Sequence, residues 1–281
     1  YNDSVVLLIS VLEDLFMKKT LAVILSSFVL MAGCSANNEG NQAEEVKPIG
    51  IIGAMDSEVT SLQSELANAE VKEIAGLEFH TGELNDRDVV IVKSGVGKVN
   101  AALCAQILID EFDVDTLINT GVAGGLYSEL EVGDIVVSNQ AVQHDMDITA
   151  FGHEKGYISD MSEDGKATYF QTDKELAEKT QAIANEVMKD NKAYIGTIAS
   201  GDIFVSDQAL KEELIESFDA YAAEMEGAAI AHVASVNQIP VTIIRAISDL
   251  ANGEADVTYE EFETKAAENS AEIVRNLVKG L

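Results

Sequence analysis

The chain has 281 residues, of which 47% are hydrophobic and 24% are charged, and its formal net charge is −31 at pH 7. This hydrophobic content is enough for a buried core and argues against a disordered chain. The alternation of apolar runs with helical patterns predicts one α/β domain of about 230 residues. A strongly negative surface repels nucleic acid phosphates and anionic lipid headgroups, so nucleic acid is not an expected partner, whereas a neutral small molecule can approach.

The first 47 residues are predicted to lie outside that domain. Residues 1–16 contain no Met and precede Met17, so we interpret them as a misassigned translation start. Two lysines, a short apolar stretch and small residues follow within 17–33, a pattern typical of a bacterial lipoprotein signal peptide. Cys34 then carries the lipid, and 34–47 form a polar, flexible tether. We expect an exported protein, lipid-anchored to the bacterial cell membrane and touching it only through that anchor; the alternative is a buried segment with an incidental cysteine.

From residue 48 onward, the sequence predicts strands and helices in alternation. The predicted strands are Ile49–Gly53, Leu77–Glu83, Asp88–Ser94, Thr116–Thr120, Ile135–Ala141, Tyr194–Ser200, Tyr221–Met225 and a β-branched run, Ile239–Ile244, that leads to Asp249. The predicted helices are Asp56–Asn68, Gly97–Phe112, Asp173–Lys189, Asp207–Phe218, Gly227–Val236 and a last helix that begins with a capping box of Thr258 and Glu261 and ends before Gly280.

Four further features of the domain are predicted from local composition. Residues 85–86 mark a hairpin, and the glycines within 121–125 form a turn whose backbone can approach a ligand closely. Residues 152–172 lack periodicity, which indicates a long excursion at the rim of the site or at a subunit contact. Cys104 lies in an apolar helical stretch and is expected to be a core residue.

Acidic residues follow apolar runs at three separate places in the chain. Glu58 comes shortly after the first strand, Glu226 follows the strand near Met225, and Asp249 ends the β-branched run. Because ligands of open α/β sheets bind at the carboxyl ends of strands, we expect these carboxylates to meet in one cleft. Taken singly, Asp249 can also be a helix N-cap, and Glu224 and Glu226 solvated strand positions.

The segments that carry these residues are similar to those of a known family. The matching motifs are Gly53–Glu58, Lys93–Lys98, Asn119–Leu126, Ser200–Phe204, Ala223–Gly227 and Arg245–Asp249. They closely resemble the 5′-methylthioadenosine/S-adenosylhomocysteine nucleosidases, members of the nucleoside phosphorylase-like family. The resemblance runs from about Ile49 to Leu281 and implies that 48–281 form a single-domain three-layer α/β/α sandwich with a mixed central sheet. It also implies hydrolysis of the N-glycosidic bond of both nucleosides, releasing adenine and the 5′-thioribose product, with no cofactor or metal.

The resemblance further implies roles for particular residues. Asp249, helped by the Ser248 hydroxyl, is the general acid that protonates adenine N7, and Glu58 orients and deprotonates the water. Glu226 accepts hydrogen bonds from the ribose hydroxyls. The other expected substrate-binding residues are Phe204, which stacks on adenine, Val205, whose backbone reads the base edge, Glu224, Met225 beneath the ribose, and Met55, Ile148, Phe151 and Tyr259 around the 5′-alkylthio group. In the family the segment with Ile148 and Phe151 comes from the partner subunit, which implies a homodimer.

Two features qualify this assignment. An acid that holds its proton near neutral pH needs a raised pKa, and the apolar neighbours of Asp249 are expected to provide the burial. Val122 replaces a frequent Ser of the family and Tyr259 a frequent Phe. These departures leave open the hydrogen bonding near the ribose and the breadth of the 5′ pocket.

Several other functions stay open from the sequence. A nucleoside phosphorylase needs cations around phosphate, yet the chain has three arginines, and acidic residues follow the first strand. A futalosine-type nucleosidase shares the expected fold. From a different class, a lipoprotein that binds nucleosides for a transporter needs no water-activating carboxylate. His144 has no second histidine at ligand spacing, so no metal is expected, and 95–98 lack the spacing of a P-loop. His232 is expected in the core.

Overall fold

The computed structural model describes residues 46–162 and 164–281, which belong to one compact unit, Val46–Leu281. The predicted signal peptide, the acylated Cys34 and most of the predicted tether lie in 1–45, outside the described residues. In the described part of the chain, no helix has both the length and the apolar character needed to cross a membrane. The unit from Val46 onward carries every residue predicted to contact substrate.

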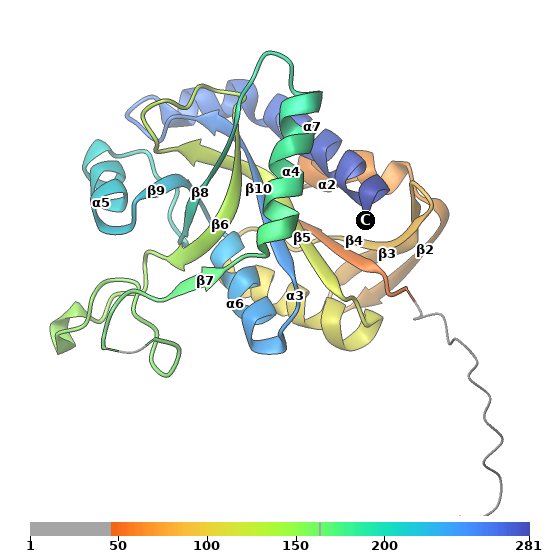
Figure 1. Ribbon diagram of the computed structural model, residues 1–281, viewed down its shortest axis with the longest axis horizontal. Coiled ribbons are helices and arrows are strands. Elements are labelled where there is room, and N and C mark those ends of the chain that lie inside the picture. Colours follow the sequence, from red (N-terminus) through yellow and green to blue (C-terminus); the bar gives the residue numbers. More distant parts are fainter. Residues whose placement is uncertain (1–45, 163) are drawn as a thin grey trace, which may run out of the picture. The chain divides into compact units, whose positions relative to one another are not determined.

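A mixed sheet forms the centre of this unit, and helices cover both of its faces (Figure 1). The strands are β1 (Ile49–Gly53), β2 (Ala67–Ile74), β3 (Leu77–Leu84), β4 (Arg87–Lys93), β5 (Thr116–Gly125), β6 (Ile135–Gln143), β7 (Tyr169–Gln171), β8 (Ala193–Ser200), β9 (Ala220–Glu224) and β10 (Val241–Asp249). The helices are α2 (Asp56–Ser64), α3 (Lys98–Phe112), α4 (Lys174–Val187), α5 (Gln208–Phe218), α6 (Gly227–Asn237) and α7 (Ala255–Gly280), with a 3-10 helix, η2 (Thr149–Phe151).

The order of the strands brings several strand ends together. The order is β10-β6-β8-β9-β5-β1-β4-β3-β2, and β10 also pairs with β5, which closes β5, β10, β6, β8 and β9 into a ring. Strands β1, β4, β5 and β10 run parallel, so their carboxyl ends share one edge. Strand β9 meets β5 antiparallel, pairing Ala222 and Ala223 with Gly125 and Gly124. The carboxyl ends of β1, β5, β9 and β10 therefore converge.

Two hydrophobic clusters hold the layers together. One joins α3 and α6 to the sheet and includes Cys104 and Ile230, and the other joins α2, α4 and α7 to it and includes Leu62 and Ile273. All residues of β1 and β10 are buried, as expected for strands that are covered on both faces. Burial raises the pKa of the Cys104 thiol to about 12, which agrees with its predicted place in the core. The predicted three-layer α/β/α sandwich with a mixed central sheet is confirmed.

The first helix and the glycine-rich segment differ from the sequence prediction. The helix predicted to reach Asn68 ends at Ser64, and β2 follows it. Strand β2 is exposed along nearly its whole length, so it lacks the apolar alternation that would reveal it. The glycines of 121–125 lie inside β5, because pairing with β10 and β9 continues to Gly125. The predicted turn is therefore wrong.

The start of the last helix was also predicted wrongly. Helix α7 begins at Ala255 and includes Gly280. Thr258 is already inside it, and its hydroxyl donates to the carbonyl of Glu254 at 3.0 Å instead of capping the helix. By contrast, the helix predicted over 207–218 is confirmed as α5, and Asp207 caps it, since its carboxylate accepts from the N–H of Ala209 at 2.9 Å.

Candidate active site

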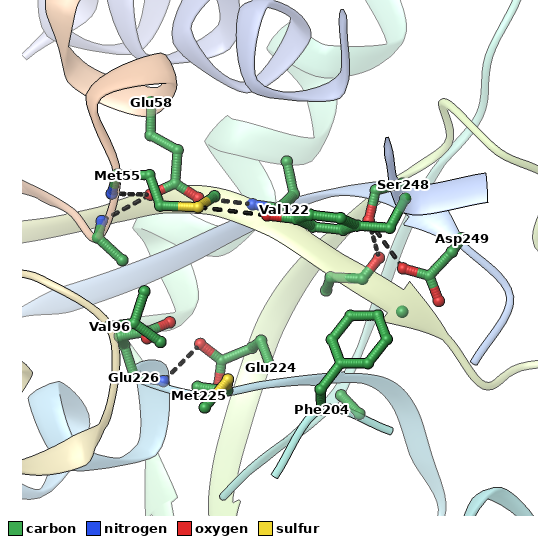
Figure 2. A pocket seen from close by; sticks show the side chains of 15 residues that line it. Met55, Glu58, Val96, Val122, Phe204, Glu224, Met225, Glu226, Ser248 and Asp249 are labelled. Carbon is green, nitrogen blue, oxygen red and sulfur yellow. Dashed lines mark hydrogen bonds between the residues drawn. The ribbon is translucent and has the colours of Figure 1, made fainter. Parts of the chain in front are cut away.

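A pocket lies at the edge of the sheet where the carboxyl ends of β1, β5, β9 and β10 converge (Figure 2). It encloses about 490 Å³ of space free of protein atoms, counting the open solvent at its mouth. It is lined by Ala54, Met55, Glu58, Val96, Val122, Ala123, Gly124, Phe204, Ala223, Glu224, Met225, Glu226, Ser248, Asp249 and Tyr259. Figure 2 shows Glu58 facing Glu226 across the pocket, with Asp249 beside Phe204 at the other end. The expected meeting of the three carboxylates in one cleft is therefore confirmed.

Glu58 is held by main-chain N–H groups from two parts of the sheet edge. It lies in the first turn of α2, and its Oε2 accepts from the N–H of Ala54 at 2.6 Å and of Met55 at 3.0 Å. Its Oε1 accepts from the N–H of Val122 in β5 at 3.2 Å. Burial raises the pKa of Glu58, although the charge of Arg245 and these hydrogen bonds oppose the rise. A carboxylate with a raised pKa is a stronger base than an exposed one.

A buried arginine lies among the carboxylates. Arg245 in β10 is 1% exposed, forms an ion pair with Glu224 of β9 and donates to the side chain of Asn119 at 2.6 Å. Glu224 also accepts from the Ser200 hydroxyl and from the N–H of Gly227 at 2.7 Å. Both oxygens of Glu224 are therefore occupied by protein donors. Glu224 therefore lines the pocket as the counter-ion of Arg245, and its expected contact with substrate stays a prediction.

Glu226 lies just beyond the end of β9, at the N-cap of α6. Its Oε1 accepts from the N–H of Gly97 at 2.8 Å, and its Oε2 lies 3.9 Å from Nη2 of Arg245. Burial and the charge of Glu224 raise the pKa of Glu226 to about 7. Glu224 and Glu226 are 7% and 6% exposed, so the alternative that both are solvated strand positions is wrong. The carboxylate of Glu226 therefore still has lone pairs that can accept hydrogen bonds from a molecule bound in the pocket.

Asp249 is the last residue of β10 and is 1% exposed. Its Oδ2 accepts from the Ser248 hydroxyl at 2.9 Å and its Oδ1 from the N–H of Ala251 at 2.8 Å. Burial raises the pKa of Asp249, against the lowering effect of these two hydrogen bonds and of Lys211. Because α7 begins at Ala255, the alternative that Asp249 caps a helix is wrong. A carboxyl group with a raised pKa is suited to hold a proton for a leaving group.

Apolar and aromatic side chains form the remaining walls. The ring of Phe204 is 45% exposed and meets the ring of Tyr259 edge to face, with centroids 5.6 Å apart. The Tyr259 hydroxyl donates to Sδ of Met55 at 3.2 Å. Burial raises the pKa of Tyr259 to about 12, so the phenol is neutral at physiological pH. An aromatic ring left half-exposed in a pocket can stack on a planar base.

Three predicted residues do not line the pocket of their own chain. Val205 is 6% exposed and packs in a cluster that includes Leu126 and Ala251, and the prediction for its backbone stays a prediction. Ile148 precedes η2, and Phe151 at the end of η2 is 81% exposed. Their contribution to the pocket of a partner subunit also stays a prediction.

The sequence prediction assigns no role in the site to Val96 or Arg245, although both lie in the matching motifs. Val96 lines the pocket. Arg245 interrupts a run of apolar residues in a strand that is buried throughout. A charge in such a strand needs a buried partner, so its position in the sequence was the signal that pointed to an ion pair near the site.

Histidines and acids do not assemble into a metal centre in the part of the chain that the structure describes. No group of three or more potential ligands occurs there. His144 is fully buried, burial lowers its pKa, and both ring nitrogens lack a hydrogen-bond partner. Asp145 instead pairs with Lys98 at 2.5 Å. His232 stacks on Phe170, with centroids 4.4 Å apart, although it is less buried than its predicted place in the core suggests.

Comparisons with known proteins agree with this site. The model of the Phosphorylase superfamily matches residues 48–279. A 5′-methylthioadenosine/S-adenosylhomocysteine nucleosidase from Geobacillus sp. (strain WCH70) is 45% identical over 234 residues, 83% of this chain and 98% of the relative. The crystal structure of the Neisseria meningitidis protein of that name, in complex with methylthio-immucillin-A, is 37% identical and has a TM-score of 0.78, covering 84% of this chain and 100% of that chain. Futalosine hydrolase of Helicobacter pylori strain 26695 is 36% identical, with a TM-score of 0.78, covering 84% of this chain and 99% of that chain. A buried carboxylate pocket in a family fold that spans nearly the whole described unit leads to one conclusion: the chain belongs to the Phosphorylase superfamily.

Proposed function

We propose that this chain is an N-glycosyl hydrolase that cleaves 5′-methylthioadenosine and S-adenosylhomocysteine, releasing adenine and the 5′-thioribose product. The observation that carries the proposal is the set of three buried carboxylates, Glu58, Glu226 and Asp249, around one pocket with an exposed aromatic ring. Relatives that carry the name of this activity match more than four fifths of the chain, as the Geobacillus protein does with 83%. The pocket, the chemistry and the relatives therefore point to the same reaction.

Asp249 supplies the proton for the leaving adenine. The C–N bond breaks with both electrons going to the base, so adenine departs as a stable neutral molecule only if a ring nitrogen is protonated. Burial raises the pKa of Asp249, which favours the protonated carboxyl group, and Ser248 donates to Oδ2 at 2.9 Å, which fixes the orientation of that group. Phe204, next to it in the pocket, offers its face to the purine.

Glu58 activates the water that attacks the ribosyl cation. Three N–H groups fix its carboxylate at the opposite end of the pocket from Asp249. A water bound to Glu58 loses a proton to it as the new C–O bond forms, so the proton count balances: Asp249 gives one proton and Glu58 gains one. Glu226, which faces Glu58 across the pocket, accepts from the ribose hydroxyls and adds negative charge near the developing cation.

Hydrolysis is favoured over phosphorolysis by the positions of the cations. Of the arginines in the described chain, Arg245 donates to Glu224, Asn119 and the carbonyl of Ile244, and Arg275 pairs with Glu65. The third, Arg87, begins strand β4 next to the hairpin. Lys93, near the start of α2, pairs with Asp56 at 2.8 Å. A dianionic phosphate beside Glu58 would be repelled without a free cation to compensate.

The test of this proposal is cleavage in phosphate-free buffer. Methylthioadenosine should yield adenine and free methylthioribose at a rate that does not rise when phosphate is added. Methylthioribose 1-phosphate as the main product would instead identify a phosphorylase. Binding of the nucleoside without any release of adenine would favour the transporter-type binding lipoprotein.

A futalosine-type activity is a second candidate, because the H. pylori futalosine hydrolase is as similar in fold as the nucleosidases. A kcat/KM higher for futalosine than for either thioether nucleoside would establish it.

We also propose a homodimer. Large apolar side chains are exposed on two adjacent helices, with Val99 at 79% and Leu103 at 46% on α3 and Val236 at 61% on α6. Phe151, 81% exposed, is the residue expected to enter the pocket of a second copy. Burying these groups against a second chain removes apolar area from water. Sedimentation equilibrium should give twice the mass of one chain, and Val99→Asp should lower it to one; a wild-type monomer at micromolar concentration would refute the dimer.

Export and lipid anchoring are proposed from the sequence of 17–34 alone. The basic, apolar and small residues before Cys34 support them. Intact-mass analysis of the membrane fraction should show an acylated Cys34, and Cys34→Ser should leave an unacylated protein. Absence of acyl mass from the wild-type membrane fraction would remove the anchor.

A further inference from the structure

Lys211 on α5 reaches the turn that follows the proposed general acid. Its Nζ donates to the main-chain carbonyl of Leu250 at 2.6 Å and to that of Gly125 at 3.1 Å. These carbonyls belong to the residues that follow Asp249 and Gly124, which form the last pair between β10 and β5. The Lys211 side chain is half-buried, so two of its three N–H donors are committed to holding two strand ends together.

The turn that Lys211 holds determines where the Asp249 carboxylate lies. Oδ1 of Asp249 accepts from the N–H of Ala251, so its position depends on the backbone at Ala251. Ala251 has a φ of 48°, in the left-handed region, where the backbone of a residue with a Cβ is strained. On the other side, a Cβ on Gly124 would lie 3.0 Å from Oδ1 of Asp249. A strained turn this close to a reacting group needs an outside contact to keep its conformation.

We propose that Lys211 is a positioning residue for Asp249: its ammonium group fixes the turn 249–251 through the carbonyl of Leu250 and places a positive charge near the carboxylate that forms when the proton leaves. The inference rests on the proposed hydrolysis, in which Asp249 is the acid. It extends that function to a residue on α5, outside the lining of the pocket.

The charge of Lys211 lowers the pKa of Asp249. Burial has the larger effect and raises that pKa. Burial likewise lowers the pKa of Lys211, and the charge of Asp249 opposes that change. The other ionisable groups facing Asp249 are Tyr259 from α7 and, across the pocket, Glu58 and Glu226, and none of these is a cation. Lys211 therefore favours the ionised product form of the acid, which makes proton transfer to adenine easier.

The first test is the pH profile of kcat/KM for Lys211→Met in the full chain. Methionine keeps an apolar stem but removes the charge and the donors. We expect kcat/KM to fall about tenfold and the alkaline limb to move about one unit toward higher pH, because the pKa of Asp249 rises when the charge is lost and when the freed turn no longer presents the N–H of Ala251 to its carboxylate. The acid limb, which reports Glu58, should stay. Lys211→Arg should restore both values, and Lys174→Met, at an exposed position of α4, should change neither.

An unchanged alkaline limb in Lys211→Met would overturn the inference, even if activity fell, because loss of packing alone does not shift that limb. If this variant does not fold, Lys211→Gln, which keeps one donor without the charge, must shift the alkaline limb in the same direction by a smaller amount. A readout independent of turnover is the titration of the carboxyl ¹³C signal of Asp249, identified by its loss in Asp249→Asn. If the wild type releases no adenine, the proposed function fails, whereas a raised Asp249 pKa in the Lys211 variants would still support the contact and an unchanged one would reject it.

Discussion

Asp249→Asn is expected to lower kcat/KM for methylthioadenosine by at least the roughly 10²-fold typical of losing a general acid. An amide fits the same space, because its oxygen can accept from the N–H of Ala251 and its NH₂ group can donate to the oxygen of the Ser248 hydroxyl, so binding of the nucleoside should change little. The expected loss therefore falls on kcat, measured by continuous detection of free adenine. Because burial raises the pKa of Asp249, the wild type should lose activity as the pH rises through that pKa, and this alkaline limb should vanish in the variant.

The matched control is Asp256→Asn. Asp256 is an exposed carboxylate in the first turn of α7, a few residues along the chain from Asp249. Its replacement should leave kcat and the pH profile as in the wild type. If Asp249→Asn turned over at a near-normal rate, another group would have to protonate adenine, and the acid would have to be sought elsewhere in the pocket.

Glu58→Gln is expected to have a comparable effect, again at least about 10²-fold in kcat/KM. The amide of glutamine cannot take a proton from water, and its NH₂ group would face the N–H of Val122 or those of Ala54 and Met55, all of which need an acceptor. The variant should therefore also lose some thermal stability. Since the base must be ionised and its pKa is raised, wild-type activity should fall as the pH drops through that pKa, and this acid limb should be absent from the variant.

Asp56→Asn provides the control for Glu58. It lies two residues away in the same helical turn, but its carboxylate is exposed and pairs with Lys93. Exposed ion pairs contribute about 0–1 kcal/mol, so neither activity nor stability should change much. Equal losses in both variants would mean that the start of α2, rather than the Glu58 carboxylate, is what the reaction requires.

The fold and most of the pocket were predictable because they depend on pattern and position. The apolar run before Asp249 required a buried strand, and a buried strand in a parallel sheet delivers its last residue to the ligand edge. The same logic placed Glu58. Assigning chemistry to each acid also needed the family resemblance, since a lone Asp after a strand is more often a cap.

What was missed depends on contacts between distant residues. Strand β2 forms by pairing with β3, although its own residues are nearly all exposed. The extension of β5 through its glycines depends on β10 and β9 lying beside it. Glu224 and Arg245 are 21 residues apart, and only the folded sheet shows that they satisfy each other. Sequence patterns report burial along one element, and they do not report which buried charges meet.

The glycines of β5 limit how this site can change during evolution. A Cβ at Gly121 would lie 2.5 Å from Oε1 of Glu58, and one at Gly124 would lie 3.0 Å from Oδ1 of Asp249. Any side chain acquired there would displace a carboxylate before it altered the shape of the pocket. Met55, just before α2, and Tyr259, in α7, line the pocket from outside that strand, so changes there put no Cβ of β5 against either carboxylate. New substrates should arise by substitution at positions such as these, while the glycines of β5 that lie against the acids stay fixed.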